Sequence, residues 1–275
     1  MSEIQTRTME EQGKPAASHI LVVDDNPDMT DFLKRTFEGY FKRIIIAGDG
    51  VEALQLVRSH VPDIIVSDVM MPRMNGYKLC KTIKEDINIS HIPVILLTAR
   101  DDRQSQISGY KNGADGYLSK PFEVEMLMEL IRNRLKNREY TKKRYLNAGL
   151  IPTPEESTIS LTDETFLIKL NSIIQENIDN TNLGIQFICQ EVGLGRSSLY
   201  NKLKALTGMG ANEYISKLRI EKAITLISGT DMPFSEIAEK TGFTTPSYFS
   251  TAFKQYTGET PSQYKERKKK GLADK

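Results

Sequence analysis

Hydrophobic residues are arranged in two different patterns along the first half of the chain. Short apolar runs that end at polar residues, such as 20–23 and 64–66, are typical of buried strands in a parallel sheet. Between such runs, apolar residues recur at a helical period, as in 28–37 and 50–60, which predicts helices. Strands that alternate with helices form parallel sheets with right-handed crossovers. The first half is therefore predicted to be a doubly wound α/β domain with a five-stranded parallel sheet.

From residue 163 onward, apolar residues recur only at the helical period, without strand-like apolar runs, so the second half is predicted to be all-α. After a first amphipathic helix, a helix–turn–helix unit occurs twice, at 185–206 and at 234–256, and 212–227 is expected to be one long helix between them. Each unit has a glycine in its turn and a Ser or Thr near the start of its second helix. This pattern is typical of helix pairs that read DNA.

Neither pattern is present between the two halves, where 151–158 is rich in proline and polar residues, as expected of a linker. Two domains also suit a length of 275 residues, since domains commonly have about 100 to 200 residues. The predicted organisation is a polar segment at 1–16, an α/β domain at 17–137, a linker at 138–162, an all-α domain at 163–270 and a tail at 271–275.

Composition narrows the class of protein. With 27% charged and 39% hydrophobic residues, the chain has the composition of a globular protein, and it has no apolar stretch of the membrane-spanning kind and no signal-peptide core. We therefore expect no membrane contact by this chain. Its two cysteines, Cys80 and Cys189, lie in different predicted domains, so we expect reduced thiols and a cytoplasmic location.

The charge is distributed unevenly, although the formal net charge is only +1. Basic residues outnumber acidic ones between 196 and 270, so an anionic partner is expected to bind the last third of the chain. The basic run at 265–270 contributes much of this surplus, but such a run by itself also suits a solvated, frayed tail.

Polar side chains end four of the predicted strands. Asp68 follows one apolar run, Asp24 and Asp25 follow an earlier one, and Thr98 and Lys120 follow two later ones. Because the carboxyl ends of parallel strands meet at one edge of the sheet, three carboxylates are expected to converge there on one cation, beside a hydroxyl and an ammonium. Acids at strand ends also serve as helix N-caps, and for Asp24 that alternative stays open.

This order of an acid pair, a single Asp, a Thr followed by Ala99, and Lys-Pro-Phe at 120–122 resembles the receiver domain of bacterial two-component response regulators. The resemblance covers 17–137 and implies a flavodoxin-like fold in which Asp68 accepts a phosphoryl group from a histidine kinase, with Thr98 and Lys120 as further catalytic residues. It also implies Mg²⁺ as cofactor, held by Asp24 through water, Asp25, Asp68 and the Met70 backbone carbonyl.

Hard oxygen ligands suit Mg²⁺, and neighbouring carboxylates repel each other unless a cation is bound. The resemblance further implies that Tyr117 is a switch residue that changes rotamer when Thr98 moves towards the phosphoryl group. Simple packing of an aromatic residue on an edge strand is the alternative for Tyr117.

The second half resembles the AraC family of transcription regulators, most closely at 245–267, and the resemblance covers 164–268. It implies two recognition helices in successive segments of the major groove. Residues expected to face the bases are Arg196, Ser197, Tyr200 and Asn201 on the first helix, and Ser247, Tyr248 and Thr251 on the second; Lys202 and Lys254 are expected at phosphates. Asn, Arg and Ser pair well with base edges. Capping and solvation of ordinary surface helices is the alternative, above all for Ser197 and Ser247.

Together, these features predict a DNA-binding response regulator of a two-component phosphorelay. Its expected partners are double-stranded DNA and a histidine kinase, in cis or in trans, and a homodimer is left open. An alternative is a Mg²⁺-dependent phosphatase-like enzyme, which also forms an aspartyl-phosphate. Such an enzyme needs a second acid two residues after the nucleophile, where this chain has Met70. A receiver that only scaffolds partners is a third possibility.

The stretch 162–180 also resembles the junction found in hybrid two-component proteins, which join a sensor, a membrane span, a kinase, a receiver and an AraC module in one polypeptide. This resemblance implies that the chain is the carboxy-terminal part of a membrane sensor kinase. The full-length protein would then be anchored in the inner membrane, and any kinase activity would lie outside this chain.

Overall fold

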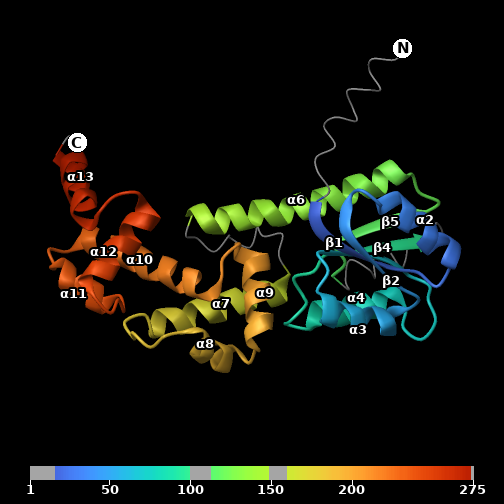
Figure 1. Ribbon diagram of the computed structural model, residues 1–275, viewed down its shortest axis with the longest axis horizontal. Coiled ribbons are helices and arrows are strands. Elements are labelled where there is room, and N and C mark those ends of the chain that lie inside the picture. Colours follow the sequence, from blue (N-terminus) through green and yellow to red (C-terminus); the bar gives the residue numbers. More distant parts are fainter. Residues whose placement is uncertain (1–15, 100–112, 149–159, 274–275) are drawn as a thin grey trace, which may run out of the picture. The chain divides into compact units, whose positions relative to one another are not determined.

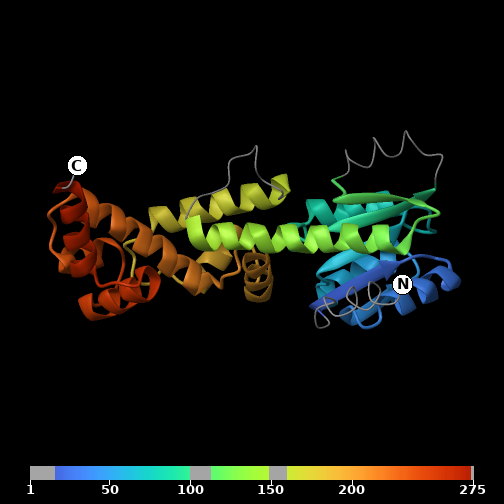
Figure 2. The same ribbon diagram turned by 90° about the horizontal axis from the view of Figure 1, so that it is seen from above.

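The computed structural model describes residues 16–99, 113–148 and 160–273, which form two compact units (Figures 1 and 2). The predicted segment 1–16 and the proline-rich stretch of the linker lie almost wholly outside the described residues. None of the described helices combines the length and the apolar character that a membrane span needs.

The first unit is a parallel sheet with the strand order β2-β1-β3-β4-β5, so the predicted five-stranded α/β domain is confirmed. Its strands are β1 (Ala16–Val23), β2 (Phe41–Ala47), β3 (Ile64–Asp68), β4 (Val94–Ala99) and β5 (Gly116–Lys120). Its helices among the described residues are α2 (Pro27–Phe37), α3 (Gly50–His60), α4 (Gly76–Glu85) and α6 (Val124–Ala148). Helices α2 and α6 cover one face of the sheet, and α3 and α4 cover the other (Figure 1).

Burial on both faces explains why the strands are apolar without alternation. In β1, Ile20 and Val22 pack towards α2 and α6, whereas Leu21 and Val23 pack towards α3 and α4. Successive side chains of a strand point to opposite faces, and here each face is covered by helices. The polar residues that follow such a strand are therefore placed at the edge of the sheet.

Helix α6 differs from the sequence-based expectation, which placed the end of the α/β domain at residue 137. It continues to Ala148, so the predicted linker at 138–162 begins as helix. Residues 136–148 contain no Pro or Gly, and Lys, Arg and Glu among them are good helix formers, so nothing in the sequence stops the helix at residue 137.

The second unit is all-α, as predicted. Its helices are α7 (Leu161–Glu176), α8 (Ile185–Val192), α9 (Arg196–Thr207), α10 (Ala211–Gly229), α11 (Phe234–Lys240), α12 (Pro246–Thr257) and α13 (Pro261–Ala273). The two helix–turn–helix pairs are α8–α9 and α11–α12, and α10 is the long helix between them. Each turn contains a glycine with a positive φ, 72° at Gly193 and 73° at Gly242, which permits the sharp reversal. The basic run at 265–270 lies within α13 and is not a frayed tail.

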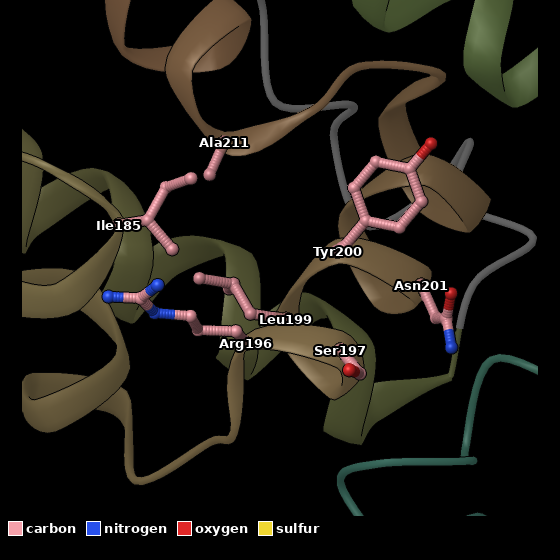
Figure 3. A pocket seen from close by; sticks show the side chains of 7 residues that line it. All are labelled: Ile185, Arg196, Ser197, Leu199, Tyr200, Asn201 and Ala211. Carbon is pink, nitrogen blue, oxygen red and sulfur yellow. The ribbon is translucent and has the colours of Figure 1, made fainter.

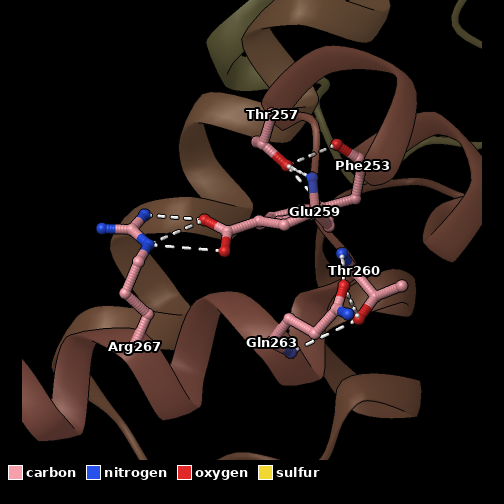
Figure 4. Close-up of polar contacts among 6 residues, drawn as sticks. All are labelled: Phe253, Thr257, Glu259, Thr260, Gln263 and Arg267. Atoms are coloured by element: carbon pink, nitrogen blue, oxygen red, sulfur yellow. Dashed lines mark hydrogen bonds and ion pairs between the residues drawn. The ribbon is translucent and has the colours of Figure 1, made fainter.

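The second unit is an internal duplication in which α9 and α12 repeat at a spacing of 50 positions, whereas α8 and α11 begin 49 positions apart. Thr207 and Thr257 end α9 and α12 in the same way: each hydroxyl donates to a carbonyl four residues earlier, at 2.8 Å, and accepts from the N–H two residues later. Figure 4 shows the second copy, in which Thr260 and Gln263 cap α13 and Arg267 pairs with Glu259. The repeat allows the two recognition helices to be compared position by position.

Candidate functional site

A polar cluster lies at the carboxyl edge of the sheet in the first unit. Asp24 follows β1, Asp68 ends β3 and Lys120 ends β5. The Lys120 Nζ donates to Asp24 Oδ2 at 2.8 Å and to Asp68 Oδ1 at 2.5 Å. The parallel topology thus brings together three residues that are far apart in sequence, as the strand-end pattern predicted.

The two carboxylates are buried, with only 3% of Asp24 and 7% of Asp68 exposed. Burial raises the pKa of the Asp68 carboxyl above its usual range, and the Lys120 ammonium opposes that rise. Burial alone would lower the pKa of Lys120, but hydrogen bonds and charges from both acids outweigh it, so the pKa of Lys120 is raised. The ammonium therefore stays charged and holds together two acids that would otherwise repel each other.

The loops around Asp68 fix its orientation. Its second oxygen, Oδ2, accepts from the Met70 N–H at 2.6 Å, and Gly76 donates its N–H to the Val69 carbonyl at 3.0 Å. A Cβ at Gly76 would collide with the Asp68 backbone carbonyl, so only glycine fits at this close approach. The β3–α4 loop therefore folds tightly beneath the acid.

Asp24 does not cap the following helix. Its Oδ1 accepts from the Asn26 N–H at 2.9 Å, and Asn26 is the N-cap of α2. Asp24 therefore shapes the turn with one oxygen and pairs with Lys120 through the other.

Thr98 and Tyr117 lie on adjacent strands next to this cluster. Thr98 is buried in β4, beside Ser119 of β5, and its hydroxyl donates to the Ala99 carbonyl at 3.2 Å. Tyr117 is half-buried and packs against the core on the α3 and α4 side. These contacts are the ones that the packing alternative expects, and the implied switch role of Tyr117 stays a prediction.

The acids do not form a ready metal shell. Within the described residues, no group of three or more Asp, Glu, His or Cys side chains is arranged to hold a metal ion. Asp25 is exposed, while a cation of the protein itself, Lys120, links Asp24 and Asp68. The donors present are hard oxygens, the ligand type that Mg²⁺ prefers.

The second candidate surface lies on helices α9 and α12. Tyr200 and Tyr248 are each 54% exposed, although they are large aromatic residues. The other residues predicted to face the bases are exposed as well, except Asn201, which is half-buried: Arg196, Ser197, Ser247 and Thr251. The N-caps of the two helices are Gly195 and Thr245, so Ser197 and Ser247 are not the capping residues.

A hollow of about 540 Å³ opens on the exposed side of the first helix–turn–helix pair (Figure 3). Polar side chains of Arg196, Ser197, Tyr200 and Asn201 line it together with the apolar Ile185, Leu199 and Ala211. In Figure 3, Arg196 lies on one side of the hollow, and Tyr200 and Asn201 lie on the other. This mixture suits base edges, which present hydrogen-bonding groups next to thymine methyl groups.

Lys202 was predicted to contact phosphates, and the structure contradicts that prediction. Its side chain is 0% exposed, its ammonium forms an ion pair with Asp163 of α7, and it lies 5.1 Å from the centre of the Phe166 ring. The charge is therefore neutralised inside the domain and cannot reach a DNA backbone. Asp163, in the first turn of α7, is thus a buried partner of α9.

The 50-residue repeat identifies the residue that sequence reasoning missed. Lys254 of α12 is exposed, and its counterpart in α9 is Lys204, which is also exposed, whereas Lys202 corresponds to Ala252. The signal was present in the sequence, because Thr-Gly ends both recognition helices and sets the register between them. Lys204 replaces Lys202 as the candidate phosphate contact.

Two parts of the chain match known protein families. Residues 20–132 match the response regulator receiver domain, and 188–267 match a helix-turn-helix domain. The response regulator MprA of a Mycobacterium species is 36% identical over 162 residues, which cover 54% of this chain and 69% of that protein. A solved receiver domain of a Francisella response regulator is 38% identical and covers 44% of this chain and 98% of that one, with a TM-score of 0.40.

Histidine kinase P4 of Formosa agariphila is 41% identical to this chain over 250 residues, which are 91% of the chain. The chain spans only 18% of the length of that kinase. These matches define the class of protein: a receiver domain followed by an AraC-type helix-turn-helix domain. The chain belongs to the response regulator family.

Proposed function

We propose that this chain is a phosphorylation-controlled, sequence-specific DNA-binding transcription regulator of a two-component phosphorelay. The observation that carries the proposal is the Lys120 ammonium held between Asp24 and Asp68 at the carboxyl edge of the sheet. A receiver needs such a positive charge beside its acceptor acid, because a phosphoryl group brings further negative charge to a site that already has several carboxylates.

The acceptor in this proposal is Asp68. One of its carboxylate oxygens attacks the phosphorus of a phosphohistidine, a new O–P bond forms, and the P–N bond breaks with its electron pair returning to the imidazole. Lys120 neutralises charge on the transferred group, and the hydroxyl of Thr98 supplies a hydrogen-bond donor. A bound Mg²⁺ supplies further charge neutralisation, and Asp24, Asp25, Asp68 and the Met70 carbonyl would hold it.

The output in this proposal is DNA binding by α9 and α12. Exposed side chains of mixed polarity on both helices support base readout, while Lys204 and Lys254 are placed for phosphates. The 41% sequence identity to histidine kinase P4 supports a kinase partner, either in trans or in cis on a longer polypeptide. We place the regulator in the cytoplasm, where both partners are available, and propose a homodimer on paired DNA sites.

The phosphatase-like alternative is not favoured. An aspartyl-phosphate phosphatase needs a proton-transferring acid two residues after Asp68, and that residue is Met70, whose side chain is exposed and cannot transfer a proton. The chain is therefore proposed to be no enzyme beyond its own phosphorylation.

Phosphorylation is tested by incubating the chain with acetyl phosphate and Mg²⁺ and measuring the intact mass. One acid-stable, alkali-labile phosphoryl group is expected, and Asp68→Asn should abolish it. Asp25→Ala should reduce labelling by weakening metal binding, whereas Asp31→Asn, which changes an exposed acid on α2, should label normally. Equal labelling of the Asp68→Asn variant would refute the assignment of the acceptor.

Switching is tested with Lys120→Ala. This variant should retain most of its Mg²⁺ binding, but phosphorylation should no longer change its affinity for DNA. An unchanged DNA response in this variant would argue against a switch role for Lys120.

DNA readout is tested by selecting binding sites from random duplexes. One monomer should protect two major-groove segments on the same face of the duplex, about 34 Å or 10 base pairs apart. Asn201→Ala and Ser247→Ala should relax base preference at different segments, each by about 1 to 3 kcal/mol. A single short motif that neither substitution changes would rule out reading by two helices and would favour the basic run as the source of affinity.

A further inference from the structure

Arg219, in the middle of α10, contacts both copies of the duplicated unit. It is 9% exposed, and its guanidinium donates from Nε to the Ile178 carbonyl at 3.3 Å and from Nη2 to the Asn180 carbonyl at 2.7 Å. Ile178 and Asn180 lie between α7 and α8, in the first copy. One side of the guanidinium is thus bound to the backbone that leads into the first helix–turn–helix pair.

The other side of the guanidinium meets the second copy. Its central carbon lies 5.9 Å from the centre of the Phe243 ring, and Phe243 belongs to the turn between α11 and α12. The preceding residue, Gly242, approaches so closely that a Cβ there would collide with the Ile178 carbonyl and lie 2.8 Å from Arg219 Nη2. The turn between α11 and α12 therefore packs directly against the Ile178 carbonyl, which also accepts a hydrogen bond from Arg219.

Phe243 in turn contacts a residue of α12 that was predicted to face the bases. The Phe243 ring also packs against Tyr248, with ring centres 5.7 Å apart and an angle of 65° between the planes. Tyr248 is one of the exposed side chains of α12. A chain of contacts from Arg219 through Phe243 thus links the first copy to a base-reading side chain of the second.

A contact of this kind can set the angle between the copies, because the apolar cluster of the second copy draws on none of the helices that precede α10. The apolar cluster around Phe249 and Phe253 draws on α10 to α13 and includes no residue of α7, α8 or α9. Helix α10 connects the two interiors, but long helices bend, so α10 alone does not fix the angle between the recognition helices. Burial lowers the pKa of the Arg219 guanidinium, and two carbonyls and a ring face offset the loss of water around the charge.

We propose that Arg219 is a positioning residue that fixes the distance and angle between the two recognition helices, and thereby the spacing of the two DNA segments that the protein accepts. The consequence for DNA rests on the proposed function. The consequence for geometry does not, because it concerns the protein without DNA.

The DNA test compares the duplex selected by the unaltered protein with the same duplex carrying one extra base pair between the two protected segments. One base pair moves the second segment by about 3.4 Å and turns it by roughly 35°, so the unaltered protein should bind the longer duplex at least about tenfold more weakly. Arg219→Met, which keeps the apolar stem, should reduce that penalty to about threefold or less. Lys222→Met, which removes a half-buried cation from the same helix, should leave the penalty unchanged.

The same penalty in a folded Arg219→Met protein as in the unaltered protein would overturn the proposal. If Arg219→Met does not fold, Arg219→Lys provides the test, since a lysine retains the charge but cannot bind both carbonyls in the planar geometry of a guanidinium. An unchanged penalty in that variant would equally overturn it.

A second measurement separates this inference from the proposed function. Spin labels at Gln190→Cys on α8 and Lys240→Cys on α11, in a Cys189→Ser background, report the distance between the two copies by double electron–electron resonance. A narrow distribution is expected for Arg219 and a broader one for Arg219→Met. Equal widths would overturn the positioning role even if DNA binding is intact, whereas a protein that selects no duplex but shows this broadening would contradict only the proposed function.

Discussion

The buried ion pair between Lys202 and Asp163 should contribute to the stability of the second unit. Lys202→Met keeps most of the apolar stem but leaves the Asp163 carboxylate buried without its cation. Removing one partner of a buried pair typically costs about 3 to 5 kcal/mol, because the remaining charge is uncompensated. The lost contact with the Phe166 ring acts in the same direction. The free energy of unfolding of the second unit should therefore fall by about that amount.

Urea unfolding followed by hydrogen exchange of peptides from 163–207 measures this effect without interference from the first unit. With an m-value of about 1 to 3 kcal/mol per molar urea, the midpoint should fall by at least about 1 M. Replacing both partners, as Asp163→Leu with Lys202→Met, should recover most of the loss, because a buried pair is often no more stabilising than apolar side chains of similar size.

Lys204→Met is the matched control, since Lys204 lies two residues further along the same helix and is exposed. Its stability should change by less than about 0.5 kcal/mol, whereas its affinity for DNA should fall and the salt dependence should become shallower by about one unit of slope. The opposite result, in which Lys202→Met is as stable as the unaltered protein but has the shallower salt dependence, would refute the assignment and restore Lys202 as a phosphate contact.

Three further outcomes follow from the described geometry. Gly76→Ala should destabilise the first unit by about 1 to 3 kcal/mol and slow phosphorylation in intact-mass assays, because its Cβ would push against the Asp68 carbonyl; normal labelling would contradict this. Burial raises the pKa of the Cys80 thiol to about 12, so Cys80 should react with iodoacetamide only after unfolding. Burial and the Glu221 carboxylate raise the pKa of Tyr256 from 10.0 to about 12. Between these pH values the folded state keeps the phenol proton and the unfolded state loses it, so the free energy of unfolding should fall as the pH rises. In Tyr256→Phe the free energy of unfolding should depend less on pH over the same range.

Much of the first unit could be predicted from its sequence because the relevant signals are local. An apolar run that stops at a polar residue identifies a buried strand and its end, and the rule that parallel strands share a carboxyl edge brings Asp24, Asp68 and Lys120 together. The extent of α6 was harder to predict, because stopping a helix depends on a breaker, and the first proline after residue 137 is Pro152.

In the second unit, the sequence determined where the helices and turns lie, since glycines with a positive φ and the helical period are local features. It did not determine which charged side chains point outward. Lys202 is buried because Asp163, on another helix, meets it, and Arg219 is buried because two carbonyls and a ring from different copies surround it. A lysine or arginine has the same charge in either setting, so only the tertiary structure, which supplies partners distant in sequence, decided which cations are paired inside the domain and which are exposed.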